Sequence, residues 1–250
     1  MAERDPYLVP GLLRGLQALR AFSPLRPEMG LSEIAEALGV SRSAAFRTVY
    51  TLAAEGCLLA VGPGPRYRLG PAVVGLGYGY HASRELLEVA QPPLERLRDA
   101  CDWSAHLGVL DGRHILYLLR IPASDGLSSL VHVGSRLPAA STSMGRVFLA
   151  HRSTRFVRAL YRGLEPAALQ RILEARKRDR RQPHVASLGS FETGLCSVAA
   201  PVRDLGGGVV AAISATKNTD RIPAKVVDLV LRTAESIGRG LGWQPADGGG

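Results

Sequence analysis

The chain has 250 residues, and its 31 basic and 22 acidic side chains leave a formal net charge of +9. At roughly 150 residues per domain this length fits one or two domains, and 46% hydrophobic residues supply a packed core, which excludes wholesale disorder. No apolar run reaches the ~18 residues that span a bilayer, the N-terminus lacks an apolar signal segment, and the three cysteines form no CxxC pair. We therefore expect a soluble cytoplasmic protein with no metal or other cofactor and no membrane partner.

The first 70 residues, 1–70, follow the element order of a winged helix-turn-helix. Apolar residues at helical spacing predict a first helix near residues 12–22 and a short second helix over residues 32–38. Gly39 ends the second helix, because glycine readily adopts the left-handed conformation that a helix stop needs. A third helix follows over residues 42–55, and residues 57–69 predict two strands joined by a turn rich in proline and glycine.

The third helix is the predicted recognition helix. Ala45, Val49 and Leu52 recur at i, i+4 and i+7 and should face the core, which directs the opposite side of its N-terminal half toward DNA. Arginine binds guanine edges or phosphates, and serine hydroxyls bind phosphates. The expected DNA contacts are Ser41, Arg42, Ser43, Phe46 and Arg47 on this helix, with Arg66 and Arg68 on the hairpin.

Some of these basic and aromatic residues have a purely structural alternative. Phe46 can be a core aromatic, Arg47 can be a plain surface arginine, and Arg66 and Arg68 can be ordinary solvated side chains of a hairpin. Charge alone points elsewhere, since residues 146–181 hold 11 basic against 3 acidic residues, whereas residues 1–80 hold 8 against 6. We interpret the basic run 176–181 within that segment as a solvated helix end.

Residues 71–91 predict a linker and dimerisation helix. Their apolar pattern is helical, and the segment is closed by Pro92 and Pro93. Three glycines at 75, 77 and 79 weaken the helix at about 1 kcal/mol each relative to alanine, which indicates close packing against a partner. The same glycines do not form a dinucleotide-binding loop, because no buried strand precedes them.

Residues 92–250 predict an α+β domain with an antiparallel sheet flanked by helices. Asp111-Gly112 is a strong hairpin signal between the first two strands, and Ser141 to Ser143 precede a helix that runs through Ala150. The expected strands cover residues 104–110, 114–121, 127–133, 195–202 and 208–216, and the expected helices cover 143–150, 153–162, 166–178 and 223–241.

Four segments together resemble the IclR family of bacterial transcription regulators over nearly the whole chain. They are Leu31–Arg47 in the winged part, and Leu137–Ala150, Glu192–Val202 and Val209–Thr216 in the second part. Residues 141–146, with Val109–Gly112 upstream, are most similar to the branch that controls catabolism of aromatic acids through the β-ketoadipate pathway.

The resemblance implies a GAF-like effector-binding domain after the linker and a homodimer or dimer of dimers on a double-stranded DNA operator. It also implies a small organic acid effector, of the protocatechuate or 4-hydroxybenzoate kind. A helix N-terminus favours such a carboxylate. Carried over position by position, the effector pocket is lined by Ser143, Met144, Gly145, Ser197, Ser214 and Thr216.

The sequence departs from the family pattern at two places. Phe46 occupies a position that is polar in many relatives, which implies a different operator sequence. Before the Glu192 motif some relatives carry an acidic or hydrogen-bonding ligand contact, and here Ser187 and Ser190 are the candidates to replace it.

Three alternatives stay open at this level. The C-terminal half can bind a protein partner instead of a metabolite, and the pocket hydroxyls can be ordinary strand residues that bond the backbone. The chain can also be a hydrolase that uses Cys196 as nucleophile and His184 as base, although a free cysteine in an apolar strand is more often a packing residue. Repression and activation use the same parts, so the sequence does not separate them.

Overall fold

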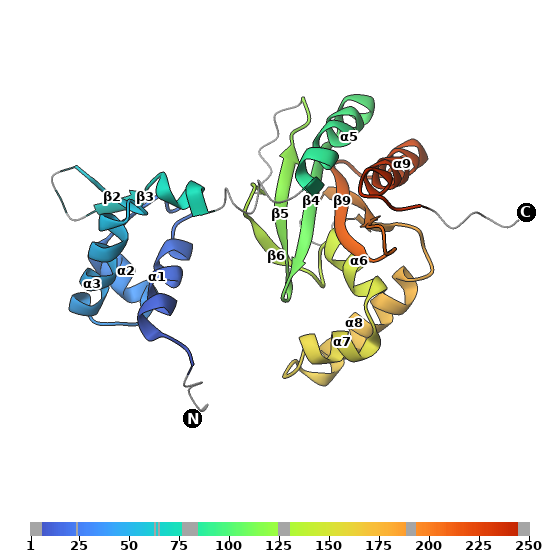
Figure 1. The fold of residues 1–250 in the computed structure, drawn as a ribbon. Helices are drawn as coiled ribbons and strands as arrows, with labels where there is room; N and C mark the ends of the chain where they lie inside the picture. Colours follow the sequence, from blue (N-terminus) through green and yellow to red (C-terminus); the bar gives the residue numbers. More distant parts are fainter. Residues whose placement is uncertain are drawn as a thin grey trace, which may run out of the picture. The chain divides into compact units, whose positions relative to one another are not determined.

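The computed structural model describes residues 7–23, 25–62, 64, 66–76, 85–124, 131–188 and 194–244. It divides into two compact units, Met1–Ser83 and Arg84–Gly250 (Figure 1). The first is a winged helix-turn-helix and the second an α+β domain, which confirms the predicted fold class. Within these ranges no helix is both long and apolar enough to cross a membrane.

The N-terminal unit consists of three helices and a three-stranded antiparallel sheet in the order β1-β3-β2. Ala18 of the first helix, Ile34 of the second and Ala45 of the third are fully buried and meet in one apolar core with Met29 and Leu58. The elements are α1 (Pro10–Ala21), β1 (Glu28–Gly30), α2 (Leu31–Leu38), α3 (Arg42–Ala54), β2 (Leu58–Val61) and β3 (Arg66–Leu69).

The turn between α2 and α3 forms as its sequence predicts. Gly39 adopts φ +62°, and its N–H donates to the carbonyl groups of Ala35 and Glu36. Ser41 then caps α3, because its Oγ accepts from the Ala44 N–H at 3.3 Å. The strand β1 was not predicted; its three residues pair with β3 and widen the wing.

The predicted linker helix differs from the structure at its end. Residues 72–76 are helical, and residues 77–84 lie outside the described residues. The predicted stop at Pro92 and Pro93 is wrong, since both prolines lie inside the continuous helix α5 (Glu85–Cys101). Its buried face, formed by Leu86, Ala90, Leu94 and Leu97, packs on the C-terminal domain, and this burial outweighs the lost N–H donors.

The C-terminal unit contains a six-stranded antiparallel sheet in the order β6-β5-β4-β9-β8-β7. Most of the predicted strand 127–133 lies outside the described residues, the described remainder is not strand, and a short strand follows three residues later. The strand over residues 185–188 was also not predicted. The strands are β4 (Ser104–Asp111), β5 (His114–Ile121), β6 (Arg136–Pro138), β7 (Val185–Leu188), β8 (Leu195–Arg203) and β9 (Val209–Asn218).

Helices cover both faces of this sheet. The helices α5 and α9 (Ala224–Gly240) lie side by side on one face (Figure 1). The other face carries α6 (Ser143–His151), followed by α7 (Thr154–Leu160) and α8 (Pro166–Asp179). At Gly145 only glycine fits, because a Cβ atom there would lie 2.2 Å from the carbonyl oxygen of Ala139. Close packing therefore fixes the N-terminus of α6 on the sheet.

Candidate functional site

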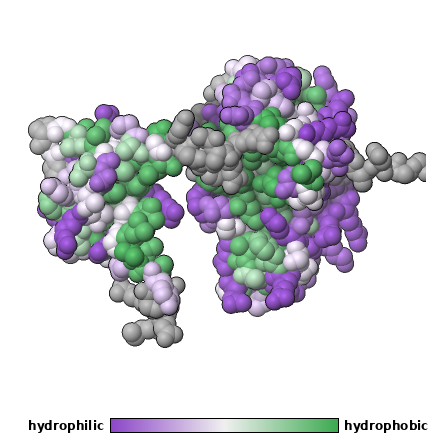
Figure 2. Space-filling model, in the orientation of Figure 1, coloured by the Kyte–Doolittle hydropathy of each residue, from purple (hydrophilic) through white to green (hydrophobic). Residues whose placement is uncertain are grey.

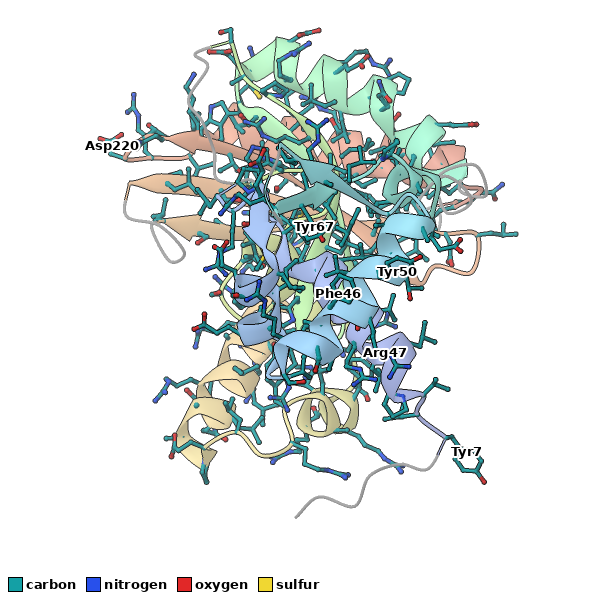
Figure 3. All side chains as sticks on the ribbon, turned by 90° about the vertical axis from the view of Figure 1, so that its left-hand side faces the viewer. Tyr7, Phe46, Arg47, Tyr50, Tyr67 and Asp220 are labelled. Atoms are coloured by element: carbon teal, nitrogen blue, oxygen red, sulfur yellow. The ribbon has the colours of Figure 1, made fainter. Side chains whose placement is uncertain are left out.

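The N-terminal half of α3 presents exposed polar and aromatic side chains on its outer side. Ser41, Arg42, Ser43 and Arg47 are exposed, whereas Ala45 is fully buried on the inner side. The alternative that Phe46 is a core aromatic is wrong, since its side chain is 49% exposed. Figure 3 shows Phe46 and Arg47 projecting from this helix.

Tyr50 joins this surface and was missed by the sequence reasoning. It lies one helical turn after Phe46, is 68% exposed, and its ring centroid is 6.2 Å from that of Phe46 (Figure 3). The i, i+4 spacing from Phe46 was the available signal. Two exposed aromatic rings beside Arg47 give the helix apolar groups that can contact thymine methyls as well as cationic ones for guanines and phosphates.

The two wing arginines are in different states. Arg66 is held by its own domain: its Nη1 lies 3.3 Å from Glu33 Oε2, and its Nη2 donates to the Glu28 carbonyl oxygen at 3.1 Å. Arg68 is exposed and makes no ion pair among the described residues. Arg66 thus ties the wing to β1 and α2, and Arg68 is the freer cation.

An apolar groove of about 680 Å³ lies between α1 and α3 of the same unit. Leu12, Leu16 and Leu76 line it and are 62%, 41% and 67% exposed. Figure 2 shows the resulting hydrophobic surface over α1. An exposed apolar surface of this kind is typical of a protein contact rather than of a DNA contact, although Arg47 of α3 also lines one side of the groove.

The C-terminal unit contains a small cavity, partly open to solvent, between the N-terminus of α6 and the sheet, with a volume of about 40 Å³. Ser143 Oγ and Ser197 Oγ are 2.7 Å apart, and Thr216 Oγ1 donates to Ser197 Oγ at 3.3 Å. Since one water needs about 10–15 Å³, a cavity of this volume has room for a few waters only. Its lining is His106, Tyr117, Val131, Leu137, Ser141, Thr142, Ser143, Ser187, Leu195, Ser197 and Thr216.

The predicted effector residues fall into two groups. Ser143, Ser197 and Thr216 line the cavity. Met144 and Gly145 are core residues of α6, and Ser214 is 2% exposed in β9; none of these three is among the lining side chains. Ser214 and Thr216 are two positions apart on β9 and therefore share a face of the sheet with Ser197, which pairs with Thr216.

The backbone at the start of α6 leaves amides unused. Thr142 caps the helix by accepting from the Gly145 N–H at 3.2 Å. The N–H groups of Ser143 and Met144 have no acceptor among the described residues, as is usual for the first turn of a helix. These amides carry the partial positive charge of the helix N-terminus, which favours an anion.

His106, Tyr117 and Ser187 also line the cavity, and the sequence reasoning singled out only Ser187. The rings of His106 and Tyr117 meet edge to face with centroids 5.6 Å apart. Burial, with a smaller contribution from Arg120, lowers the pKa of His106 to about 3, and burial raises the pKa of Tyr117 to about 12. Both side chains are therefore neutral at pH 7. Ser190, the second candidate to replace the family's ligand contact, lies outside the described residues.

The surroundings of Cys196, the candidate nucleophile, are those of a packing residue. Its thiol donates to the Thr219 carbonyl oxygen at 3.0 Å, and burial raises the pKa of the thiol, which disfavours the reactive thiolate. His184 precedes Val185, and Val185 pairs with Ala199 rather than with Cys196. The register separates the two groups by three to four positions, roughly 10–13 Å along the strand.

The basic run at 176–181 lies at the C-terminal end of α8. Asp179 within it accepts from Arg146 Nε at 2.9 Å and from Arg146 Nη2 at 2.6 Å, and Arg176 Nε donates to the Arg152 carbonyl oxygen at 2.9 Å. The remaining cations of the run are exposed. Cations at this end stabilise the helix dipole, consistent with a solvated helix end.

An exposed, serine-capped helix beside a β-wing, in a chain that also carries a separate α+β domain, is the arrangement of a DNA-binding regulator. Residues 11–60 match the IclR helix-turn-helix domain, and residues 78–239 match the family model described as bacterial transcriptional regulator IclR C-terminal. The chain belongs to the IclR family. It is a DNA-binding transcription regulator and not an enzyme, which removes the Cys196 hydrolase alternative.

Relatives agree with this membership over most of the chain. The chain is 33% identical over 227 residues to the Pca regulon regulatory protein of Pseudomonas putida, which covers 87% of this chain and 77% of that protein. It is 30% identical over 245 residues to the p-hydroxybenzoate hydroxylase transcriptional activator of Acinetobacter baylyi, covering 91% and 89%. An IclR homologue from Microbacterium hydrocarbonoxydans, crystallised with 4-hydroxybenzoate, has a TM-score of 0.81 at 25% identity, covering 92% and 98%.

Proposed function

We propose that this regulator binds an aromatic carboxylic acid in the C-terminal cavity and that the bound acid changes its affinity for an operator. The observation that carries the proposal is the meeting of three hydroxyls, Ser143, Ser197 and Thr216, with the unused amides at the N-terminus of α6. Neutral donors at a helix N-terminus bind carboxylates without a cationic side chain. Similarity to the Pca regulon regulator, to the p-hydroxybenzoate hydroxylase activator and to the homologue crystallised with 4-hydroxybenzoate supports an aromatic ligand.

Binding of an aromatic acid requires the cavity to widen. The hydrogen bond between Ser143 and Ser197 joins α6 to β8 across a space of about 40 Å³, too small for a benzene ring. The acid therefore replaces this bond with bonds of its own and separates the two elements. Its effect on DNA binding depends on unequal affinity for the narrow and widened arrangements, because equal affinity shifts no equilibrium.

On the DNA side, we propose a homodimer, alone or as a dimer of dimers, that places two recognition helices on a pseudo-palindromic operator. The apolar groove lined by Leu12, Leu16 and Leu76 supports an association through the N-terminal units. A dimer with two-fold symmetry binds two inverted half-sites, and the distance between its two recognition helices sets the distance between the half-sites.

Fluorescence anisotropy on the DNA upstream of the chain's own gene tests the proposal. The titration is run at two salt concentrations against unrelated competitor DNA, with and without 4-hydroxybenzoate or protocatechuate, because phosphate contacts alone make a basic protein bind at low salt. We expect selective binding at the higher salt that one acid changes at least threefold. Selective binding that neither acid changes contradicts the effector assignment and favours a protein partner for the C-terminal half.

A pair of serine variants tests whether the acid binds in the C-terminal cavity. Ser197→Ala removes the hydroxyl that contacts both Ser143 and Thr216, and it should weaken 4-hydroxybenzoate binding several-fold in calorimetry. Ser236→Ala, on the exposed side of α9, makes the same chemical change away from the cavity and should leave the affinity unaltered. Equal affinity in both variants would place the ligand elsewhere.

A further inference from the structure

His106 forms part of the cavity wall, yet its ring nitrogens have no hydrogen-bond partner. The residue is the third of β4 and is 2% exposed, and neither Nδ1 nor Nε2 finds a partner among the described residues. A neutral imidazole has one donor and one acceptor, and buried polar atoms are normally paired. The folded chain thus leaves hydrogen-bonding capacity unused at the cavity.

Arg120 accompanies His106 on the same face of the sheet. The antiparallel register places it directly opposite His106, on the neighbouring strand β5. Its Nε is buried without a partner, and within the described part of the chain its guanidinium makes no ion pair. Its charge also disfavours a proton on His106, so the pair combines a neutral acceptor with a cationic donor.

Ser197 and Thr216, which form a hydroxyl cluster with Ser143 of α6, occupy a different row of the same sheet face. Thr216 and Ser197 pair with each other, whereas the row that contains His106 passes through Ser214, two positions along β9. Two residues along a strand span about 7 Å. Val131, Leu137 and Leu195 supply apolar lining to the same cavity. This arrangement suits a flat apolar body with a polar group at each end.

We propose that His106 and Arg120 bind a phenolic hydroxyl of the effector, while its carboxylate lies at the hydroxyl cluster and the N-terminus of α6. The inference rests on the proposed function and names the ligand class within it: hydroxylated aromatic acids rather than unsubstituted ones. A phenol donates one hydrogen bond, which the neutral imidazole accepts. Arg120 does not line the cavity in its present form but lies opposite His106, so its Nε can donate to the phenol oxygen once the ligand widens the cavity. A site built to pair a hydroxyl discriminates strongly against an analogue that lacks it, because the buried groups then stay unpaired.

Isothermal titration calorimetry with 4-hydroxybenzoate and benzoate tests this assignment on the full-length protein. We expect the wild type to bind 4-hydroxybenzoate at least tenfold more tightly than benzoate. His106→Phe, which keeps the ring shape, should weaken 4-hydroxybenzoate binding at least tenfold and benzoate binding much less, so that the preference collapses. His114→Phe makes the same change at the hairpin end of β5, where His114 pairs with Asp111, and should keep the preference.

A purely structural role for His106 gives a different pattern. Removing an unpaired buried polar group without changing its shape leaves the unliganded protein as stable as before or more stable. We therefore expect His106→Phe to raise or maintain the Tm without ligand, whereas a structural histidine would lower it. If His106→Phe does not fold, Arg120→Met is measured in the same way and should also lose at least tenfold for 4-hydroxybenzoate.

The outcomes separate the two proposals. A wild type that binds neither acid overturns the aromatic-acid function and this inference with it. A wild type that binds both acids equally, or variants that keep the preference for the hydroxyl, overturn the role of His106 and Arg120 and leave the aromatic-acid function standing.

Discussion

On the recognition helix α3, Arg47 and the rings of Phe46 and Tyr50 project into solvent, whereas in the cavity the hydroxyls of Ser143, Ser197 and Thr216 bond one another. The first region keeps its contact groups free, so that DNA adds interactions without breaking any. In the second region the three hydroxyls already bond one another, so a ligand that binds them has to replace existing bonds, even though His106 stays unpaired. Substitutions should therefore affect binding alone on α3, but both binding and stability around the cavity.

The largest expected effect is on the packing that holds the cavity. Gly145→Ala would place its methyl 2.2 Å from the Ala139 carbonyl oxygen, a backbone atom that a rotamer change cannot move. We expect a loss near or above the upper end of the about 1–3 kcal/mol that overpacking costs, seen as a lower Tm of the C-terminal unit. Gly206→Ala is the control, because its methyl would meet Asp204 Oδ1 at an ordinary 3.5 Å. Equal Tm values for both variants would contradict close packing at α6.

A second effect follows from the buried histidine. Burial lowers the folded-state pKa of His106 to about 3, below an ordinary value of 6.5, so the folded state favours the neutral ring. Above pH 6.5 both states are neutral and stability is at its full value. As the pH falls toward 3, the unfolded chain binds a proton that the folded chain resists, and stability drops by up to about 1.4 kcal/mol per pH unit.

Urea unfolding at pH 7, 6 and 5 measures this dependence. His151, whose pKa burial lowers to about 4, adds a smaller share because solvent screens its half-exposed ring. His106→Phe removes the larger share and should flatten the slope between pH 6 and 5. An unchanged slope would show that His106 is not the group that titrates.

On α3 the expected effect is on affinity alone. Arg47→Ala removes a free guanidinium and should weaken operator binding by about 1–3 kcal/mol if Arg47 contacts a base, and it should relax selectivity at that position. Its Tm should equal that of the wild type, because Arg47 makes no ion pair among the described residues. Arg20→Ala, at the exposed C-terminal end of α1, is the matched control in the same anisotropy assay. Unchanged affinity and selectivity for Arg47→Ala would refute the recognition-helix assignment.

The same contrast explains what the sequence predicts well. The helix-turn-helix depends on local signals, such as the left-handed Gly39 and the cap at Ser41, and both form as predicted. The stop at Pro92 and Pro93 failed because a local proline signal was outweighed by the burial of Leu86, Ala90 and Leu94 on a surface that forms only in the folded domain. His106 was missed for a related reason, since its proposed role depends on the strand register that places it opposite Arg120 and Ser214 on other strands.

The smallest expected effect distinguishes the two wing arginines. Arg68→Ala removes a free cation and should weaken binding to every DNA sequence alike, by less than about 1 kcal/mol, and lower the slope of log K against log salt by about one. Arg66→Ala removes a side chain that already bonds Glu33 and Glu28, so its effect on the salt slope should be smaller. Anisotropy at four salt concentrations measures both slopes. A larger slope change for Arg66→Ala than for Arg68→Ala would mean that Arg66 leaves Glu33 for a phosphate when DNA binds. The wing would then also contribute cations to DNA binding, in addition to those of α3.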